Sequence, residues 1–159
     1  MKQALLVILV ALSLAACGDN SSQQAKKEAA PAAGAPAPTA DGRTPSPPGA
    51  KVTILEPKDG ATVKSPVTVK FGVEGMEVVP AGTDKPNSGH HHLFIDAKLE
   101  DPATSIPADA KHIHYGKGQT EAQVELAPGK HALQDVFADK NHVPHNPPVV
   151  SDVVTITVE

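Results

Sequence analysis

The alternation that decides the fold runs through Val67-Thr68-Val69-Lys70-Phe71-Gly72-Val73, where apolar residues take every second position. A period of two is the pattern of a β-strand with one buried face. The stretches 122–126 and 154–158 repeat it, and the 3.6-residue period of an amphipathic helix is not found in residues 51–159. This part of the chain therefore predicts an all-β domain.

Further stretches read as strands because turn residues separate them. Turns such as Asp59-Gly60 and Pro128-Gly129 punctuate the chain. About seven short strands in this order predict an immunoglobulin-like antiparallel β-sandwich. Since the domain has no Cys, no disulfide links its sheets, and the core is expected to be aliphatic. The expected strands are 51–56, 67–73, 76–79, 91–96, 122–126, 131–138 and 154–158, with 112–115 as a further short strand.

Composition limits both the size of the fold and its partners. A chain of 159 residues with 16 Pro and 3% aromatic residues has room for one small domain without a large aromatic core. Asp and Glu number 18 against 14 Lys and Arg, and Arg43 is the one arginine. Nucleic-acid binding requires a basic surface, so this class of partner is excluded.

The N-terminus has the layout of a signal peptide over residues 1–16. Lys2 precedes an apolar run at 4–12, which is shorter than the ~20 residues of a membrane span. The end of the run, Leu14-Ala15-Ala16-Cys17, resembles the lipobox of bacterial lipoproteins, which implies cleavage before Cys17 and lipidation of its sulfur. Gly18 then resembles the sorting signal for the outer membrane, with the domain in the periplasm. Residues 17–50 lack large apolar residues and predict a disordered tether, which leaves 51–159 as the folded domain.

Histidines are the main chemical signal. All eight lie in residues 51–159, and seven form three clusters at 90–92, 112–114 and 142–145. Imidazole is the commonest metal-binding side chain and is mostly neutral near pH 7. Because residues i and i+2 share one face of a strand, His90 and His92 point one way with Phe94, and His91 points the other way.

Strand order predicts where the clusters meet. If 91–96, 112–115, 121–126 and 130–138 alternate in direction, the start of the first strand and the loop after the last lie at one end. His131 would lie at the opposite end and is left out of the site. The candidate metal ligands are His90, His92, His112, His114, His142 and His145.

The donor types narrow the choice of metal. With no Cys and only Met76 in the domain, a soft Cu(I) site has little support, and imidazoles favour Zn(II) or Cu(II). The nearby carboxylates are Asp96, Glu121 and Asp139, of which Glu121 is a candidate to orient an imidazole or is simply solvated. Alternatively, the His clusters form a buried polar network that fixes the end of the sandwich.

A series of motifs resembles the bacterial family catalogued as domain of unknown function 4399, over most of residues 52–158. The resemblance implies a secreted or lipid-anchored β-sandwich and no established activity. It also leads us to expect an aliphatic residue at position 135, where this chain has Asp135. The motifs are Gly60-Ala61-Thr62-Val63, Phe71-Gly72-Val73-Glu74-Gly75-Met76, Pro80-Ala81-Gly82, Gly89-His90-His91-His92-Leu93-Phe94-Ile95-Asp96, His114-Tyr115-Gly116-Lys117-Gly118-Gln119-Thr120-Glu121 and Pro128-Gly129-Lys130-His131-Ala132-Leu133-Gln134.

Motifs for catalysis are missing from the sequence. It has no Gly-x-Ser-x-Gly, no Cys nucleophile in the domain and no phosphate-binding loop, so we do not expect an enzyme. The predicted function is a periplasmic protein, anchored to the membrane through Cys17, that binds Zn or Cu as a carrier, buffer or accessory. Two alternatives stay open: His-based metal hydrolysis or dismutation, and an envelope module that binds a protein or glycan partner with structural His clusters.

Overall fold

The computed structural model describes residues 39–159, which form strands and no helix. The predicted signal peptide, Cys17 and most of the predicted tether lie outside the described residues. Within residues 39–159, no helix has the length and hydropathy that a membrane span requires. The ten strands are β1 (Lys51–Glu56), β2 (Thr62–Val63), β3 (Val67–Glu74), β4 (Glu77–Val78), β5 (Ser88–Ile95), β6 (His112–Tyr115), β7 (Glu121–Val124), β8 (Gly129–Ala138), β9 (Pro144–Val150) and β10 (Val154–Val158).

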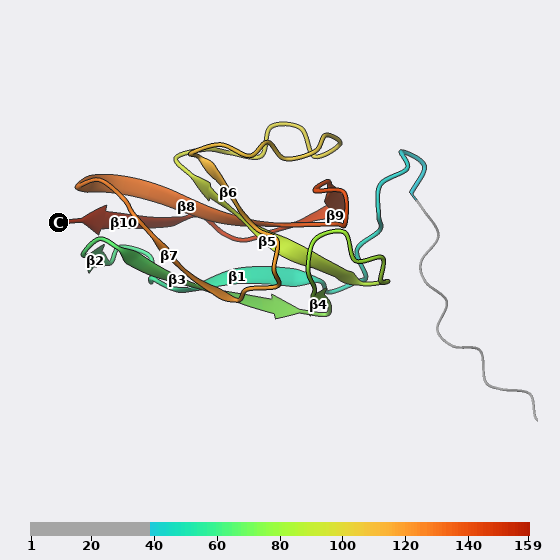
Figure 1. The fold of residues 1–159 in the computed structure, drawn as a ribbon, viewed down its shortest axis with the longest axis horizontal. Helices are drawn as coiled ribbons and strands as arrows, with labels where there is room; N and C mark the ends of the chain where they lie inside the picture. The colour runs from blue at the N-terminus through green and yellow to red at the C-terminus, as the bar shows by residue number, and fades with distance from the viewer. Residues whose placement is uncertain (1–38) are drawn as a thin grey trace, which may run out of the picture. The chain divides into compact units, whose positions relative to one another are not determined.

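Two sheets make up an immunoglobulin-like β-sandwich, which confirms the predicted fold class (Figure 1). The smaller sheet has the order β1-β3-β7. The larger has the order β2-β10-β8-β5-β4, with β6 paired to β5 and β9 paired to β8. Pairing is antiparallel except for two short parallel pairs, β10 with β2 and β4 with β5. The strand 112–115, on which the placement of the histidines depends, is present as β6.

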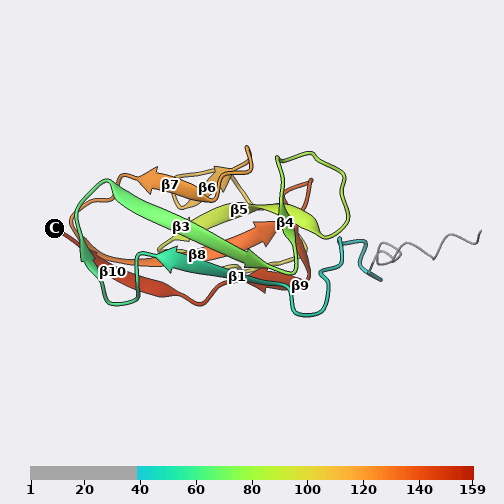
Figure 2. The same cartoon turned by 90° about the horizontal axis from the view of Figure 1, so that it is seen from below.

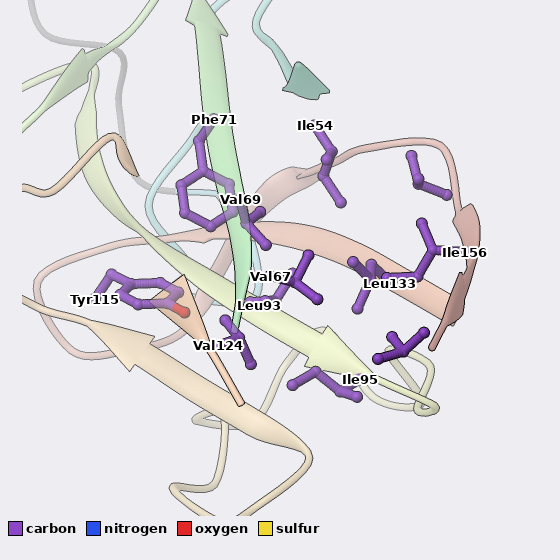
Figure 3. Packing of buried hydrophobic residues seen from close by; sticks show 12 residues of the cluster. Ile54, Val67, Val69, Phe71, Leu93, Ile95, Tyr115, Val124, Leu133 and Ile156 are labelled. Carbon is purple, nitrogen blue, oxygen red and sulfur yellow. The ribbon is translucent and has the colours of Figure 1, made fainter. Parts of the chain in front are cut away.

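The core lies between the sheets and is mostly aliphatic, as expected (Figure 3). In β3 the side chains of Val67, Val69 and Phe71 are buried, and the residues between them are only partly buried. They pack against Leu93 and Leu133 of the larger sheet. Each fully buried aliphatic or Phe side chain contributes about 1.5–3 kcal/mol to folding, so this alternation accounts for the joining of the two sheets.

Strand β5 is the exception, because it is buried on both faces. Its inner face adds Leu93 and Ile95 to the core between the sheets. On its outer face Phe94 packs with Ile106 and neighbouring residues of β8. The segment 96–111, which contributes Ile106, therefore covers part of the outer face of the larger sheet.

The Pro-rich stretch after His142 forms β9, where a loop was predicted. Its prolines lack an N–H donor, which is compatible with a strand at the edge of the sheet, where few ladder donors are needed. Accordingly β9 pairs with the end of β8, with an irregular register at Phe137 and Ala138. The consequence for the site is that His145 lies within a strand.

The folded part also begins earlier than predicted. Residues 39–46, which we call the strap, were assigned to the tether but run along the start of β9. The backbone N–H of Asn146 donates to the carbonyl of Thr44 over 2.9 Å, and the N–H of Ser46 donates to the carbonyl of Asn146 over 3.1 Å. The strap lacks large apolar side chains, so hydrophobic patterning could not identify it. Figures 1 and 2 place it at the end of the domain opposite the C-terminus.

Candidate metal centre

Four imidazoles meet on the outer face of the larger sheet. His90 and His92 come from β5, and His114 of β6 lies directly opposite His92 in the strand pairing. His90 is opposite Ala138, the last residue of β8, so the loop that follows brings His142 to the same place. The ring of His142 lies 5.0 Å from that of His90 and 4.7 Å from that of His114, between centroids. Three separate segments thus form one cluster, at the end where the sequence predicted it.

Nitrogen spacing within the cluster suits a metal ion. His90, His114 and His142 each offer a ring nitrogen, and these three atoms lie within 4.8 Å of one another. The Nε2 atoms of His90 and His92 are 3.0 Å apart. Two nitrogens bound to one tetrahedral zinc lie about 3.3 Å apart, given the usual Zn–N distance. The His90–His92 pair is therefore close to ligand spacing, and the nitrogens of the triad would approach one another by up to about 1.5 Å to reach it.

Burial favours the neutral form of the inner imidazoles of the cluster. It lowers the pKa of His90 to about 4 and that of His92 to about 2, and the neighbouring imidazoles add to the effect. Burial, followed by the electrostatic effect of the neighbouring His142, also lowers the pKa of His114. Since a neutral imidazole is the form that binds a metal, these rings do not have to lose a proton first at neutral pH.

Two polar atoms in the cluster have no partner. One neutral Nε2–H is shared between His90 and His92, whereas the Nδ1 atoms of both rings are buried and unpaired within residues 39–159. A structural polar network normally satisfies its buried atoms, because each unpaired one is costly. The two Nδ1 atoms are therefore available to a ligand.

One side of the cluster is open. His90 and His92 are 0% and 1% exposed and form its floor, whereas His142 is half-buried and His114 is exposed. An ion held by the triad would thus be reached from the His114 side. The arrangement can bind and exchange an ion without unfolding of the sheet.

Gly116 makes room for His114, a role that the sequence analysis missed. A Cβ at this position would lie 2.2 Å from Cε1 and 2.3 Å from Nε2 of His114. The imidazole therefore lies against the backbone of Gly116, and any side chain there would displace the ring. The sequence feature that could have indicated this role is the position of Gly116, two residues after the candidate ligand His114.

Two of the six candidate ligands lie outside the cluster. His112 is on the same face, but its Nδ1 is 2.8 Å from Oδ1 of Asp109 and its ring packs on Phe94. His145 is fully buried, with its Nδ1 3.3 Å from the carbonyl of Phe137 and its Nε2 3.2 Å from that of Ser88. The expectation that His145 converges with the others is wrong, because β9 directs it toward Phe137 rather than toward the loop.

His131 and the carboxylates are distributed elsewhere. His131 binds Asp96 over 2.8 Å near the start of β8, away from the cluster as predicted. Glu121 is exposed and faces Lys70 in the smaller sheet, because β7 joins β3. It is therefore not in a position to orient an imidazole of the cluster. Asp139 is buried in the loop that carries His142.

The inner face of β5 holds a different polar pair. Nδ1 of His91 is 2.8 Å from Oδ2 of Asp135, and both side chains are 0% exposed. The imidazole stacks on Phe71 with a centroid distance of 4.7 Å. Burial raises the pKa of Asp135, although the bond to His91 opposes it. His91 thus explains the unexpected Asp135. A buried polar contact that involves a clustered histidine therefore exists, but on the face of β5 opposite the candidate metal site.

Fold and site together define a small β-sandwich with a His cluster that could hold a metal ion. The chain belongs to the family described as Domain of unknown function (DUF4399), whose model matches residues 69–159 and so confirms the resemblance. A search of curated proteins gives no match. Among solved structures, the chain is similar to "Structures of Clostridium thermocellum CbhA fibronectin(III)-like modules", with a TM-score of 0.43 and 14% identity over 67% of this chain and 93% of that one.

Proposed function

We propose that this protein binds a divalent transition metal ion through His90, His114 and His142, with His92 beside them. The observation that carries the proposal is the approach of three ring nitrogens, from three separate segments, to within 4.8 Å of one another. Imidazole donors suit Zn(II) and Cu(II). Met76 packs with an apolar cluster that includes Val52, so it is not a soft ligand here.

A carrier, buffer or accessory role fits this site better than catalysis. Metal-binding histidines usually donate their second N–H to a carboxylate, carbonyl group or water, which fixes the ring. Within residues 39–159, none of the four imidazoles of the cluster forms a hydrogen bond to a carboxylate. An open site whose rings lack carboxylate partners favours exchange of the ion. Lipidation of Cys17 would hold the protein at the periplasmic face of the envelope, with the outer membrane favoured, within reach of a protein partner.

The test is thermal unfolding of the full-length, metal-stripped protein with and without Zn(II) or Cu(II), at pH 7.5 and at pH 4. Free ion at 100 times its Kd stabilises the folded state by about 2.7 kcal/mol. We expect an upward shift of Tm at pH 7.5 that is smaller at pH 4, because the pKa of His90 is about 4 and a protonated imidazole cannot bind. The difference between loaded and stripped protein is compared at each pH, since the cluster itself titrates.

Two matched variants assign the effect to the cluster. His114→Ala removes an exposed ligand and should strongly reduce the shift, whereas His112→Ala, two residues away on the same strand, should keep it. Absence of a shift with either ion, or an equal shift in both variants, would overturn the proposal. The cluster would then be a candidate surface for a protein or glycan partner.

A further inference from the structure

The strap, residues 39–46, is connected to the loop that carries His142. We infer that Thr44 and Asp139 are positioning residues for His142, so that docking of the strap and metal binding are coupled. The inference rests on the proposed function, since it concerns the same site. It follows from the hydrogen bonds that hold the loop and from those that join the loop to the strap.

Asp139 closes the loop on itself. Its Oδ1 accepts hydrogen bonds from the backbone N–H of Asn141 over 2.8 Å and of Val143 over 3.1 Å. In addition, the N–H of His142 donates to the carbonyl of Asp139, and the N–H of Asp139 donates to the carbonyl of Val143, both over 2.9 Å. One carboxylate thus organises the turn on both sides of His142.

The backbone of His142 needs this support. Its φ angle is +64°, in the left-handed region that residues other than glycine seldom occupy. Its carbonyl accepts a hydrogen bond of 2.9 Å from the N–H of Ile106, in the segment that covers the outer face. Neighbouring groups therefore maintain the conformation that points this ring toward His90 and His114.

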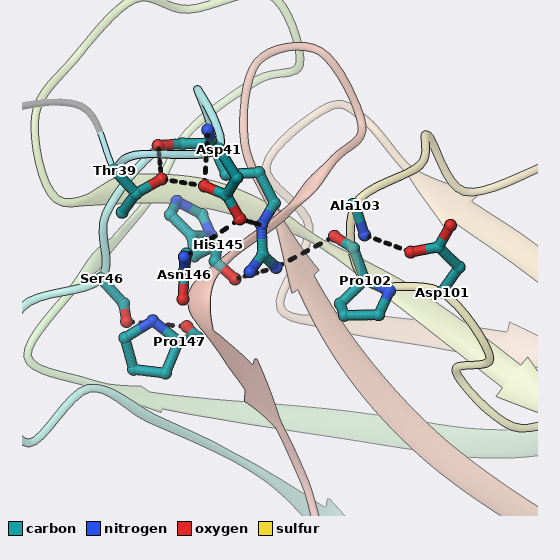
Figure 4. A network of polar contacts seen from close by, with 10 residues as sticks. Thr39, Asp41, Ser46, Asp101, Pro102, Ala103, His145, Asn146 and Pro147 are labelled. Carbon is teal, nitrogen blue, oxygen red and sulfur yellow. Dashed lines mark hydrogen bonds and ion pairs between the residues drawn. The ribbon is translucent and has the colours of Figure 1, made fainter.

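Thr44 joins the strap to this loop. Its hydroxyl donates to Oδ2 of Asp139 over 2.6 Å, so the second oxygen of the carboxylate is bound by the strap. Next to it, Nη1 of Arg43 donates to the carbonyls of His145 and Pro102, at 3.2 and 3.1 Å (Figure 4). The strap is therefore tied to the start of β9, to the segment 96–111 and, through Asp139, to a candidate metal ligand.

Coupling of this kind acts in both directions. A metal ion that holds His142 stabilises the loop and hence the bond between Asp139 and Thr44, and release of the strap weakens the hold on the ion by the same factor. Because the strap lies on the Cys17 side of the domain in the sequence, the affinity of the site would depend on whether the segment leading to the proposed anchor is docked.

The test uses the full-length protein and three variants. Thr44→Val removes the hydroxyl at nearly constant shape, Thr44→Ser retains it, and Ser46→Ala removes a different strap contact, to the carbonyl of Pro147. The measurements are the Kd for Zn(II) or Cu(II) and the hydrogen exchange of residues 39–46 with and without metal. We expect Thr44→Val to weaken binding about tenfold, as loss of an orienting group often does, and the other two variants to bind as the wild type does.

Two further results distinguish positioning from general stability. Metal should slow exchange in the strap of the wild type but not of Thr44→Val. In a His142→Ala background, Thr44→Val should have no further effect on Kd, because the ligand that it positions is gone. If Thr44→Val binds as tightly as the wild type, or if it weakens binding equally without His142, the inference is wrong while the proposed function stands. If the wild type binds no metal, both fail.

Discussion

Three successive histidines of β5 have two different environments. On the inner face, His91 forms one hydrogen bond, to Asp135, and stacks on Phe71 in the core between the sheets. On the outer face, His90 and His92 meet other imidazoles beside an open edge. Because successive side chains of a strand point to opposite faces, adjacent histidines of β5 lie in unrelated sites. Clustering in sequence is therefore weaker evidence for a shared site than clustering on one face.

The two faces of β5 also differ in the titratable groups that they bring together. The inner pair combines an acid with a base, so that a proton can be shared in the core. The outer cluster contains bases only, whose neutral state is maintained by burial and mutual repulsion. Both arrangements leave buried polar atoms unpaired within residues 39–159, including Nε2 of His91 and Oδ1 of Asp135. Only the outer one brings several imidazole nitrogens close enough to share one ion. Three experiments separate these roles, beginning with the largest expected effect.

The inner pair should dominate stability. Asp135→Ala leaves His91 buried without its partner, and breaking a buried pair in this way costs about 3–5 kcal/mol. Replacing both residues, His91→Leu with Asp135→Leu, removes the unpaired group and should recover most of the loss. Urea unfolding measures both. If the double variant is no more stable than Asp135→Ala, the structural role assigned to the His91–Asp135 pair is wrong. If the double variant no longer shows the increase in Tm with metal, the two faces of β5 are not independent.

The outer cluster should make the metal-free protein sensitive to acid. The pKa values of His90 and His92 lie below the value near ~6.5 that histidine has in an unfolded chain. Between about pH 6.5 and 4 the unfolded state therefore binds more protons, so the free energy of unfolding decreases as the pH falls through this window. His92→Gln should make this decrease shallower in denaturant unfolding measured at several pH values.

His131 provides a control of opposite sign. Its hydrogen bonds to the carbonyl of Ala127 and to Asp96 raise its pKa. Its contribution to the stability of the folded state is therefore fully present below the pKa of the unfolded chain, and it is lost as the pH rises through the pKa of the folded protein. His131→Gln should thus steepen the loss of stability toward acid. Equal slopes in the wild type and both variants would show that these groups do not control the pH dependence.

The smallest effect on stability is expected from Gly116→Ala. The new methyl group meets the ring of His114, which is exposed and can rotate away. Unfolding should change by less than about 1 kcal/mol, as for most surface substitutions, while metal affinity falls about tenfold. Gly118→Ala serves as a comparison for backbone effects, since its φ is +78° and its nearest neighbours belong to Val79 and Pro80. If both variants bind metal equally well, the position of His114 does not limit binding.

Much of this arrangement could be predicted from local sequence, because strand periodicity is a local property. The alternation in 67–73 identified the buried face of β3, and the spacing of His90, His92 and Phe94 identified a common face of β5. The alternating directions of successive strands also predicted that His131 and the cluster lie at opposite ends of the domain. The count of strands included β7, which lies in the smaller sheet, and the result holds because β5 pairs directly with β6 and β8.

The sequence by itself determined the all-β class and the faces on which its histidines lie, since both depend on the period of the extended chain. Only the tertiary structure decided which histidines meet, because that depends on partners far apart in the sequence. His145 turns inward because Pro144 starts an edge strand, and Asp135 is tolerated in the core because His91 lies beside it. The strap docks through backbone groups and a hydroxyl, which every sequence has in abundance and no hydrophobic pattern distinguishes.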